Sequence, residues 1–134
     1  MELFQSKKIV VLTDFSRAYY VETDSYLFSI IINNLILNAL KYSTVNDTLN
    51  VKIVENGAKI ECHIIDSGMG IRKEDLEKIF NPFYRSNSTD HPEIKGTGLG
   101  LSIVKRLCSL LSIKIDILSQ EGIGTNVILT VIEA

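Results

Sequence analysis

Four polar side chains recur at helical spacing within an otherwise apolar segment. Asn34, Asn38, Lys41 and Tyr42 stand at positions i, i+4, i+7 and i+8, so a helix places them on one face. Apolar residues fill most of the positions between them, which is typical of a helix packed into a core. An amide oxygen can bind a hard cation and an ammonium group can bind phosphate, so this polar stripe has the chemistry of a metal and phosphate site. The segment by itself also fits a solvated helix rim, and the remaining elements must distinguish the two.

The composition is that of an ordinary globular domain. The chain has 134 residues, of which 46% are hydrophobic and 22% charged, so residues 1–134 are predicted to form a single domain with a buried core. A net charge of −2 gives no electrostatic basis for binding nucleic acid or an anionic membrane. An anionic ligand would therefore have to be held by local groups.

The cysteines and the apolar segments further limit the class of protein to which the chain could belong. Cys62 and Cys108 each lie in an apolar run without Cys/His metal spacing, which predicts small core residues in a reducing compartment. Residues 26–40 are interrupted by serine and asparagine, which argues against a membrane span, and no signal peptide is recognisable. The abrupt start of the sequence favours a piece of something larger.

Periodicity and turn residues predict a mixture of strands and helices. Helices are expected from an N-cap at Asp24 to about residue 42, and over residues 72–79 and 102–111. Residues 72–75 are expected to be a solvated first helical turn. The pattern predicts an α/β (α+β) two-layer sandwich, in which a mixed, largely antiparallel sheet of about five strands carries about three helices on one face. Strands are expected over residues 8–13, 19–22, 49–55, 59–66, 113–118 and 125–132, with Asn56-Gly57 as a hairpin turn.

Two glycine-rich turns offer close backbone approach to a ligand. Asp66 ends the strand over 59–66 on its apolar face, and glycines follow at positions 68 and 70. Residues 96–101 precede a helix, where free backbone N–H groups and the positive end of the helix dipole favour an anion. Their spacing matches neither a P-loop, nor a dinucleotide-binding fingerprint, nor the protein-kinase signature.

Four motifs in a fixed order carry a more specific signal. They are Asn-Leu-x-x-Asn-Ala-x-Lys-Tyr-Ser over 34–43, Asp-x-Gly-x-Gly-Ile over 66–71, Phe-x-x-Phe-Tyr-Arg over 80–85, and Gly-Thr-Gly-Leu-Gly-Leu-Ser-Ile-Val over 96–104. The set resembles the N, G1, F and G2 boxes of the catalytic, ATP-binding domain of two-component sensor histidine kinases. A Gly-x-Gly-Thr sequence ending at Thr125 is similar to the usual entry to the last strand. The resemblance covers nearly the whole chain and implies the Bergerat fold of the GHKL superfamily, which also holds gyrase, chaperone and mismatch-repair ATPases.

The resemblance implies ATP and Mg²⁺ as ligands. Asn38 is similar to the asparagine that binds Mg²⁺, Lys41 resembles the phosphate-contacting lysine, and Asp66 resembles the carboxylate that accepts the adenine amino group. Asn34, Lys41 and Arg85 are the implied catalytic residues. The implied nucleotide-binding set is Asn34, Asn38, Lys41, Tyr42, Asp66, Gly68, Gly70, Ile71, Phe83, Gly96, Thr97, Gly98, Leu99, Gly100, Leu101 and Thr125.

Some of these roles have plainer alternatives. For Tyr42 the alternative is packing, and for Arg85 it is a solvated charge in a lid over residues 86–95. Phe80 and Phe83 fit anchors of that lid in the core better than ligand contacts.

The implied reaction is transfer of the γ-phosphoryl group of ATP to a histidine on a separate dimerisation domain of the same kinase, with a response regulator as an indirect partner. Related ATPases carry a glutamate one turn before the metal asparagine, where this chain has Asn34. An amide cannot take a proton from water near neutral pH, which favours a kinase over a GHKL-family ATPase. A nucleotide-binding module without catalysis is the remaining alternative.

The two histidines are interpreted as surface residues and not as phosphate acceptors. His63 is predicted on the strand face that points away from the ATP site, and His91 lies in the lid. By resemblance, the chain is a cytoplasmic, monomeric domain of a membrane-anchored, homodimeric sensor kinase. Membrane contact would then come only through other parts of the protein.

Overall fold

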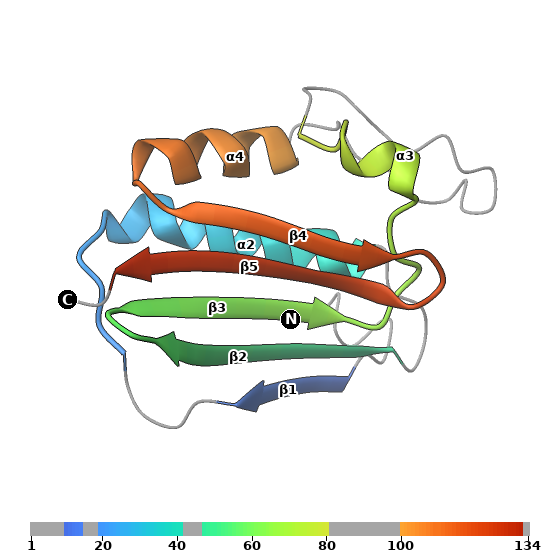
Figure 1. Ribbon diagram of the computed structural model, residues 1–134, viewed down its shortest axis with the longest axis horizontal. Coiled ribbons are helices and arrows are strands. Elements are labelled where there is room, and N and C mark those ends of the chain that lie inside the picture. Colours follow the sequence, from blue (N-terminus) through green and yellow to red (C-terminus); the bar gives the residue numbers. More distant parts are fainter. Residues whose placement is uncertain (1–9, 15–18, 42–46, 81–99, 133–134) are drawn as a thin grey trace.

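The computed structural model describes residues 10–14, 19–41, 47–80 and 100–132, and for residues 10–14 and Lys41 only the backbone. Within these ranges the chain forms five strands and three helices (Figure 1). The strands are β1 (Val10–Asp14), β2 (Thr48–Asn56), β3 (Lys59–Asp66), β4 (Lys114–Gln120) and β5 (Gly124–Ile132). The helices are α2 (Ser25–Lys41), α3 (Lys73–Leu76) and α4 (Gly100–Leu110).

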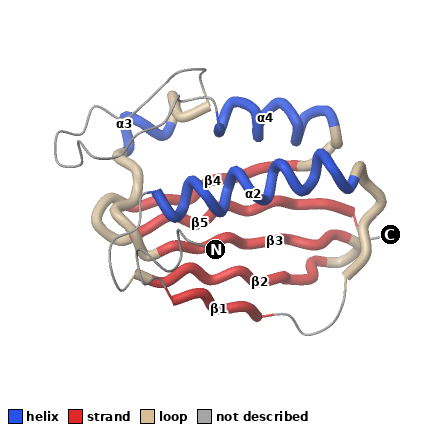
Figure 2. The backbone as a smooth tube through the Cα atoms, turned by 180° about the vertical axis from the view of Figure 1, so that it is seen from behind, coloured by secondary structure: helices blue, strands red, loops and turns tan. Residues whose placement is uncertain are grey.

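All five strands belong to one mixed sheet. Their order is β1-β2-β3-β5-β4, with β1 parallel to β2 and every other neighbouring pair antiparallel. Figure 2 shows α2 and α4 side by side in front of the same face of this sheet. The predicted two-layer sandwich, with a largely antiparallel sheet and helices on one face, is therefore confirmed.

The long helix α2 begins where its capping residue predicts. The Asp24 Oδ1 atom accepts a hydrogen bond from the Leu27 backbone N–H at 2.9 Å, and the Asp24 carbonyl accepts one from the Phe28 N–H at 2.9 Å. An aspartate in this position satisfies N–H groups that would otherwise lack a partner in the first turn.

Apolar residues on the inner faces of both layers form the core. Asn56 pairs with Lys59, so the predicted hairpin is confirmed, but its two-residue turn is Gly57-Ala58, with Gly57 at φ 66°, and Asn56 still belongs to β2. This turn sets the register that brings the buried side chains of β2 and β3 onto the helix side. The most deeply buried core residues are Ile31, Leu35, Leu40, Leu49, Ile64, Val104, Cys108 and Leu129.

The cysteines are free and lie in or against this core, as predicted. Burial raises the pKa of each thiol, Cys62 and Cys108, to about 11. In the described part of the chain, no helix has both the length and the apolar character needed to cross a membrane.

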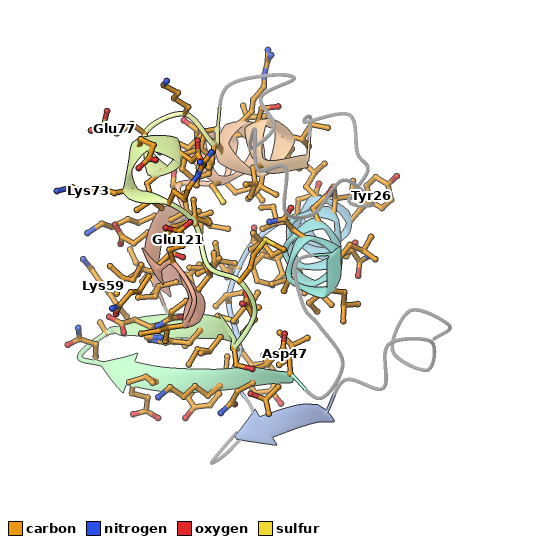
Figure 3. The ribbon with its side chains drawn as sticks, turned by 90° about the vertical axis from the view of Figure 1, so that its right-hand side faces the viewer. Tyr26, Asp47, Lys59, Lys73, Glu77 and Glu121 are labelled. Carbon is orange, nitrogen blue, oxygen red and sulfur yellow. The ribbon has the colours of Figure 1, made fainter. Side chains whose placement is uncertain are left out.

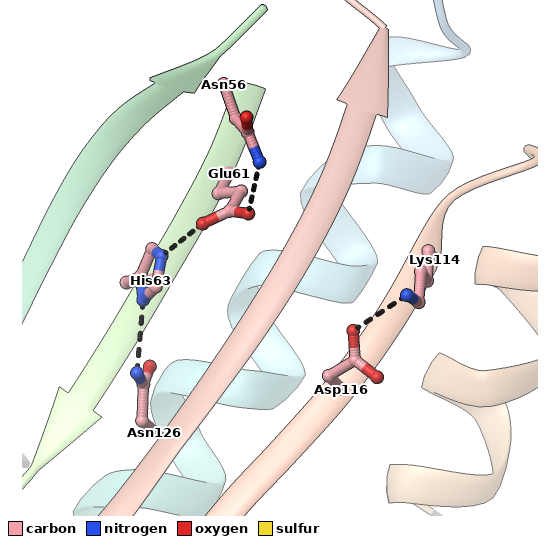
Figure 4. Close-up of polar contacts among 6 residues, drawn as sticks. All are labelled: Asn56, Glu61, His63, Lys114, Asp116 and Asn126. Carbon is pink, nitrogen blue, oxygen red and sulfur yellow. Dashed lines mark hydrogen bonds and ion pairs between the residues drawn. The ribbon is translucent and has the colours of Figure 1, made fainter. Parts of the chain in front are cut away.

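No helix of the described ranges lies on the outer face of the sheet, which has its own polar contacts. His63 Nε2 lies 3.0 Å from Glu61 Oε1, and His63 Nδ1 lies 3.1 Å from Asn126 Nδ2 (Figure 4). On β4, Lys114 Nζ lies 3.7 Å from Asp116 Oδ2. The prediction that His63 points away from the helices is confirmed, whereas His91 lies outside the described residues.

One predicted strand is wrong. Residues 19–22 form no strand and lead directly to the N-cap of α2. Figure 1 shows this segment passing the ends of the strands on its way to the helix layer. Its tyrosines and valine have a high β propensity, but the change of layer leaves the backbone without a strand to pair with.

The short helix also differs from the prediction. It spans only Lys73–Leu76 and is followed by a turn, where a helix over residues 72–79 was expected. The charged run is not wholly solvated, because the Asp75 side chain is buried and its Oδ2 atom lies 3.0 Å from Arg72 Nε. Pairing with a guanidinium offsets the cost of burying that carboxylate.

Candidate nucleotide-binding site

A row of polar side chains crosses the sheet where β3 ends. Asp66 on β3 pairs with Thr125 on β5, and Thr125 pairs with Ser119 on β4. Directly paired residues point to the same face, so all three side chains lie on the helix side, in register with buried Leu49 on β2. A polar row on the face that otherwise forms the core marks this end of the sheet as a candidate site.

Asp66 is a partly buried acid. Its Oδ1 atom accepts a hydrogen bond from the Gly68 backbone N–H at 2.9 Å. Burial raises the pKa of the Asp66 carboxyl group above its ordinary value, and the negative charge of Asp47, labelled in Figure 3, raises it further. Hydrogen bonds from the backbone N–H groups of Gly68 and Thr125 act in the opposite direction, but burial has the larger effect. A ligand that donates a hydrogen bond here would stabilise the ionised form.

The loop after Asp66 is held by the turn between β4 and β5. The Gly122 N–H donates to the Met69 carbonyl at 2.7 Å, and the Ile71 N–H donates to Ser119 Oγ at 2.8 Å. Gly70 has φ 71°, and a Cβ atom there would overlap the Gln120 carbonyl. The packing of the chain against itself thus gives a reason for glycine at position 70, and its contact with a base remains a prediction.

Ser119 is a member of the row that none of the four sequence motifs contains. Its hydroxyl group contacts the Ile71 N–H, the Gly124 carbonyl at 3.0 Å and Thr125 Oγ1 at 2.7 Å. Strand alternation contains the signal, because Ile115 and Ile117 precede it on the inner face and a serine at the next inward position is out of pattern.

A second group of candidate residues lies along α2, and one of them, Asn34, faces α4. The Asn34 Nδ2 atom donates to the Ile30 carbonyl at 2.8 Å, one turn earlier on the same helix. Its Oδ1 atom lies 3.5 Å from the place that a Cβ atom on Gly100 would occupy. The amide oxygen of Asn34 is therefore directed toward the first residue of α4. Asn38 follows one turn later and is half-buried, and Lys41 is the last residue of α2.

These two groups lie at the same end of the molecule. Figure 1 shows the end of β3, the start of β5, the C-terminal end of α2 and the N-terminal end of α4 together on the right-hand side. Figure 2, seen from behind, shows the same arrangement. The fold thus brings one end of the α2 polar stripe and the Asp66 row to one end of the domain.

The remaining predicted residues divide into packed and undescribed ones. Leu101 and Phe80 pack against the core, and Lys105 Nζ lies 5.4 Å from the centre of the Phe80 ring, so the anchor interpretation of Phe80 is supported. The residues that lie outside the described part of the chain are Tyr42, Phe83, Arg85, Gly96, Thr97, Gly98 and Leu99, together with the lid over 86–95.

Comparison with known protein families shows to which family the chain belongs. Residues 23–134 match the family described as histidine kinase-, DNA gyrase B-, and HSP90-like ATPase. The chain belongs to this family. The matched segment contains both groups of the candidate site, so the resemblance inferred from the four motifs is confirmed.

Two of the relatives of this chain are sensor kinases. The chain is 34% identical to the sensor-like histidine kinase SenX3 of Mycolicibacterium smegmatis, over 96% of this chain and 33% of SenX3. It is 35% identical to the autoinducer 2 sensor kinase/phosphatase LuxQ of Vibrio cholerae, over 89% of this chain and 14% of LuxQ. The chain therefore spans a third or less of the length of these relatives.

Solved structures show the same fold. The catalytic domain of histidine kinase ThkA superposes with a TM-score of 0.82 and 26% identity, covering 98% of this chain and 85% of that one. The mycobacterial sensor histidine kinase MprB superposes with a TM-score of 0.83 at 22% identity, covering 98% of this chain and 89% of that one. The predicted Bergerat fold of a histidine-kinase catalytic domain is confirmed.

The chemistry of the candidate site fits a nucleotide together with a hard cation. Within the described ranges no three or more His, Cys, Asp or Glu side chains cluster so that they could bind a metal by themselves. Asn34 instead presents an amide oxygen whose own N–H group is already used on Ile30, and amide oxygens are ligands that Mg²⁺ accepts alongside phosphate oxygens. The Asp66 carboxylate is an acceptor that a hydrogen-bond donor on a base would fit.

Proposed function

We propose that this chain binds Mg-ATP and transfers the γ-phosphoryl group to a histidine on a separate dimerisation domain. The observation that carries the proposal is that the Asp66 row and the Asn34 amide oxygen, which faces the start of α4 at Gly100, lie at one end of a histidine-kinase fold. In this proposal Asp66 accepts a hydrogen bond from the adenine amino group, while α2 and the start of α4 face the phosphates. The sensor-kinase names of the relatives support the same assignment.

The cation and the phosphates would lie along α2. Asn38 is the proposed Mg²⁺ ligand, with Asn34 one turn earlier and Lys41 one turn later directed to the phosphates. Bound Mg²⁺ would neutralise charge on the phosphate oxygens as the γ-phosphoryl group leaves. The contribution of the protein is mainly to position the nucleotide, with Arg85 and the glycines at 96, 98 and 100 proposed to complete the phosphate end.

Asn34 favours a kinase over an ATPase. Its Nδ2 atom is bonded to Ile30, and a carboxamide has no basic site that could deprotonate water near neutral pH. A neutral imidazole already carries a lone pair and needs no such base. The γ-phosphoryl group would therefore pass to a histidine in preference to water.

The partners follow from the length of the relatives. Because the chain spans 14% of LuxQ and 33% of SenX3, we propose that it is the catalytic piece of a larger, membrane-anchored sensor kinase. The dimerisation domain of that kinase would be the direct partner and a response regulator the indirect one. The chain itself would face the cytoplasm.

Measured ATP turnover tests the kinase assignment. The chain alone should hydrolyse ATP very slowly, because Asn34 cannot act as a catalytic base. Asn33→Ala is the matched control, since Asn33 is exposed on the same helix. Fast hydrolysis that disappears in Asn34→Ala, with Asn33→Ala unaffected, would contradict the kinase assignment. Mass spectrometry after incubation with ATP should find no phosphate on His63 or His91.

A further inference from the structure

Ser119 has three hydrogen-bond partners, and two of them have a fixed direction. The Ile71 backbone N–H, at 2.8 Å, can only donate, and the Gly124 carbonyl, at 3.0 Å, can only accept. A serine hydroxyl carries a single proton, and the Gly124 carbonyl receives it. The third partner, Thr125 Oγ1 at 2.7 Å, must then donate to Ser119.

This direction decides what Thr125 can offer to a ligand. Once its only proton is bonded to Ser119, the Thr125 hydroxyl keeps lone pairs alone for other partners. Its neighbour in the row is Asp66, whose ionised carboxylate also only accepts. Thr125 and Asp66 together form an edge that accepts hydrogen bonds and cannot donate them.

We propose that Ser119 is a positioning residue that fixes the hydroxyl proton of Thr125 away from the ligand and thereby selects a purine with an amino group over one with an oxo group at position 6. The inference rests on the proposed binding of ATP at this site. At position 6 adenine carries an amino group with two N–H donors, whereas hypoxanthine carries a carbonyl oxygen with none, so only the amino group can satisfy the two acceptors Asp66 and Thr125. Sites whose buried polar groups are left unpaired by the wrong ligand discriminate strongly.

The test compares ATP with ITP, which differ only at this edge of the base. Dissociation constants are measured by calorimetry for the native chain and for Ser119→Ala, Ser119→Thr, Thr125→Val and the double variant Ser119→Ala/Thr125→Val. The native chain should prefer ATP. Ser119→Ala should reduce the ITP-to-ATP ratio of dissociation constants by about tenfold, roughly the worth of one hydrogen bond, because the freed Thr125 hydroxyl can turn and donate to the oxo group.

The other variants separate positioning from general damage. Ser119→Thr keeps a hydroxyl group and should restore the native ratio. The double variant Ser119→Ala/Thr125→Val should have the same ITP-to-ATP ratio of dissociation constants as Thr125→Val alone. Without the Thr125 hydroxyl group, Ser119 has nothing to orient. If Ser119→Ala does not fold, Ser119→Cys still decides, because its thiol is a much weaker hydrogen-bond acceptor for the Thr125 hydroxyl and should lower the ratio in the same direction.

Three results would overturn the inference. Ser119→Ala could weaken both nucleotides equally, which would make Ser119 a structural residue only. Ser119→Ala could change the ITP-to-ATP ratio of dissociation constants by the same factor whether or not the Thr125 hydroxyl is present, which would show that Ser119 does not act through Thr125. A native chain that binds ATP without preferring it over ITP would also overturn it. All three leave the proposed function intact, whereas a native chain that binds neither nucleotide overturns the proposed function and this inference together.

Discussion

At the scale of single residues, the burial of Asp66, the proposed adenine-binding group, opposes folding when its carboxyl group is ionised. Burial raises the pKa of its carboxyl group, so the ionised form is less favourable in the folded chain than in the unfolded one. The hydrogen bonds from Gly68 and Thr125 recover only part of that cost. A donor on a bound nucleotide would supply a further hydrogen bond, and we therefore expect Asp66 to be a residue kept for binding and not for stability.

The pH dependence of unfolding tests this view of Asp66. Because the folded pKa is raised, its contribution to stability is fully present below the unfolded pKa and is lost as pH rises through the folded pKa. Asp66→Asn removes the ionisable group. The difference in melting temperature, variant minus native, should therefore be more positive at about pH 7 than at about pH 4, which is near the unfolded pKa. A difference that does not change with pH, measured without nucleotide, would show that burial does not perturb Asp66.

At the scale of elements, the loop over 66–71 is held by the turn between β4 and β5. Its contacts include the hydrogen bond from Gly122 to the Met69 carbonyl and the close approach of Gly70 to Gln120. A Cβ atom on Gly124 would likewise overlap the Asp66 carbonyl. The two turns are thus fitted to one another at the level of the backbone, and Asp66 sits at their junction.

Alanine substitutions at Gly57 and Gly70 distinguish the cost of a left-handed backbone from the cost of separating the two closely packed turns. Gly57 and Gly70 have similar φ values, 66° and 71°, but a Cβ atom on Gly57 would meet nothing within 4 Å, whereas one on Gly70 would overlap Gln120. Gly57→Ala should cost about 1 kcal/mol of unfolding free energy from the left-handed conformation alone. Gly70→Ala should cost about 1–3 kcal/mol more, because two backbone segments must move apart. Equal losses in urea unfolding would mean that the turns are not tightly fitted.

At the scale of the whole molecule, the fold was largely predictable from local patterns. Alternation in β2 and β3, the Asp24 cap and the Asn56-Gly57 turn each placed an element correctly because each signal is local in the sequence. Residues 19–22 were misassigned because strand propensity cannot show whether a pairing partner exists.

Only those residues of the candidate site that belong to a recognisable sequence motif could be predicted. Asp66 and Asn34 were found from their motifs, but the partners that hold the site are distant in the sequence. Ser119 meets Ile71 across 48 positions, and Asp75 is buried by packing that its charged neighbours do not reveal. Strand alternation marks Ser119 as an inward-facing serine, but no local pattern shows which distant residues it contacts, so only the structure identifies those partners.

Calorimetry with a non-hydrolysable ATP analogue, with and without Mg²⁺, tests the central claim most directly. The native chain should bind the analogue more tightly with Mg²⁺, and Asn38→Ala should lose that dependence on the cation. Asp66→Asn should weaken binding by about ten- to a hundredfold and abolish the preference for adenine, because a hydrogen bond to a charged group is lost. Asn33→Ala, on the exposed side of α2, should behave as native. Unchanged binding in both Asn38→Ala and Asp66→Asn would contradict the assignment of this end of the fold as the Mg-ATP site.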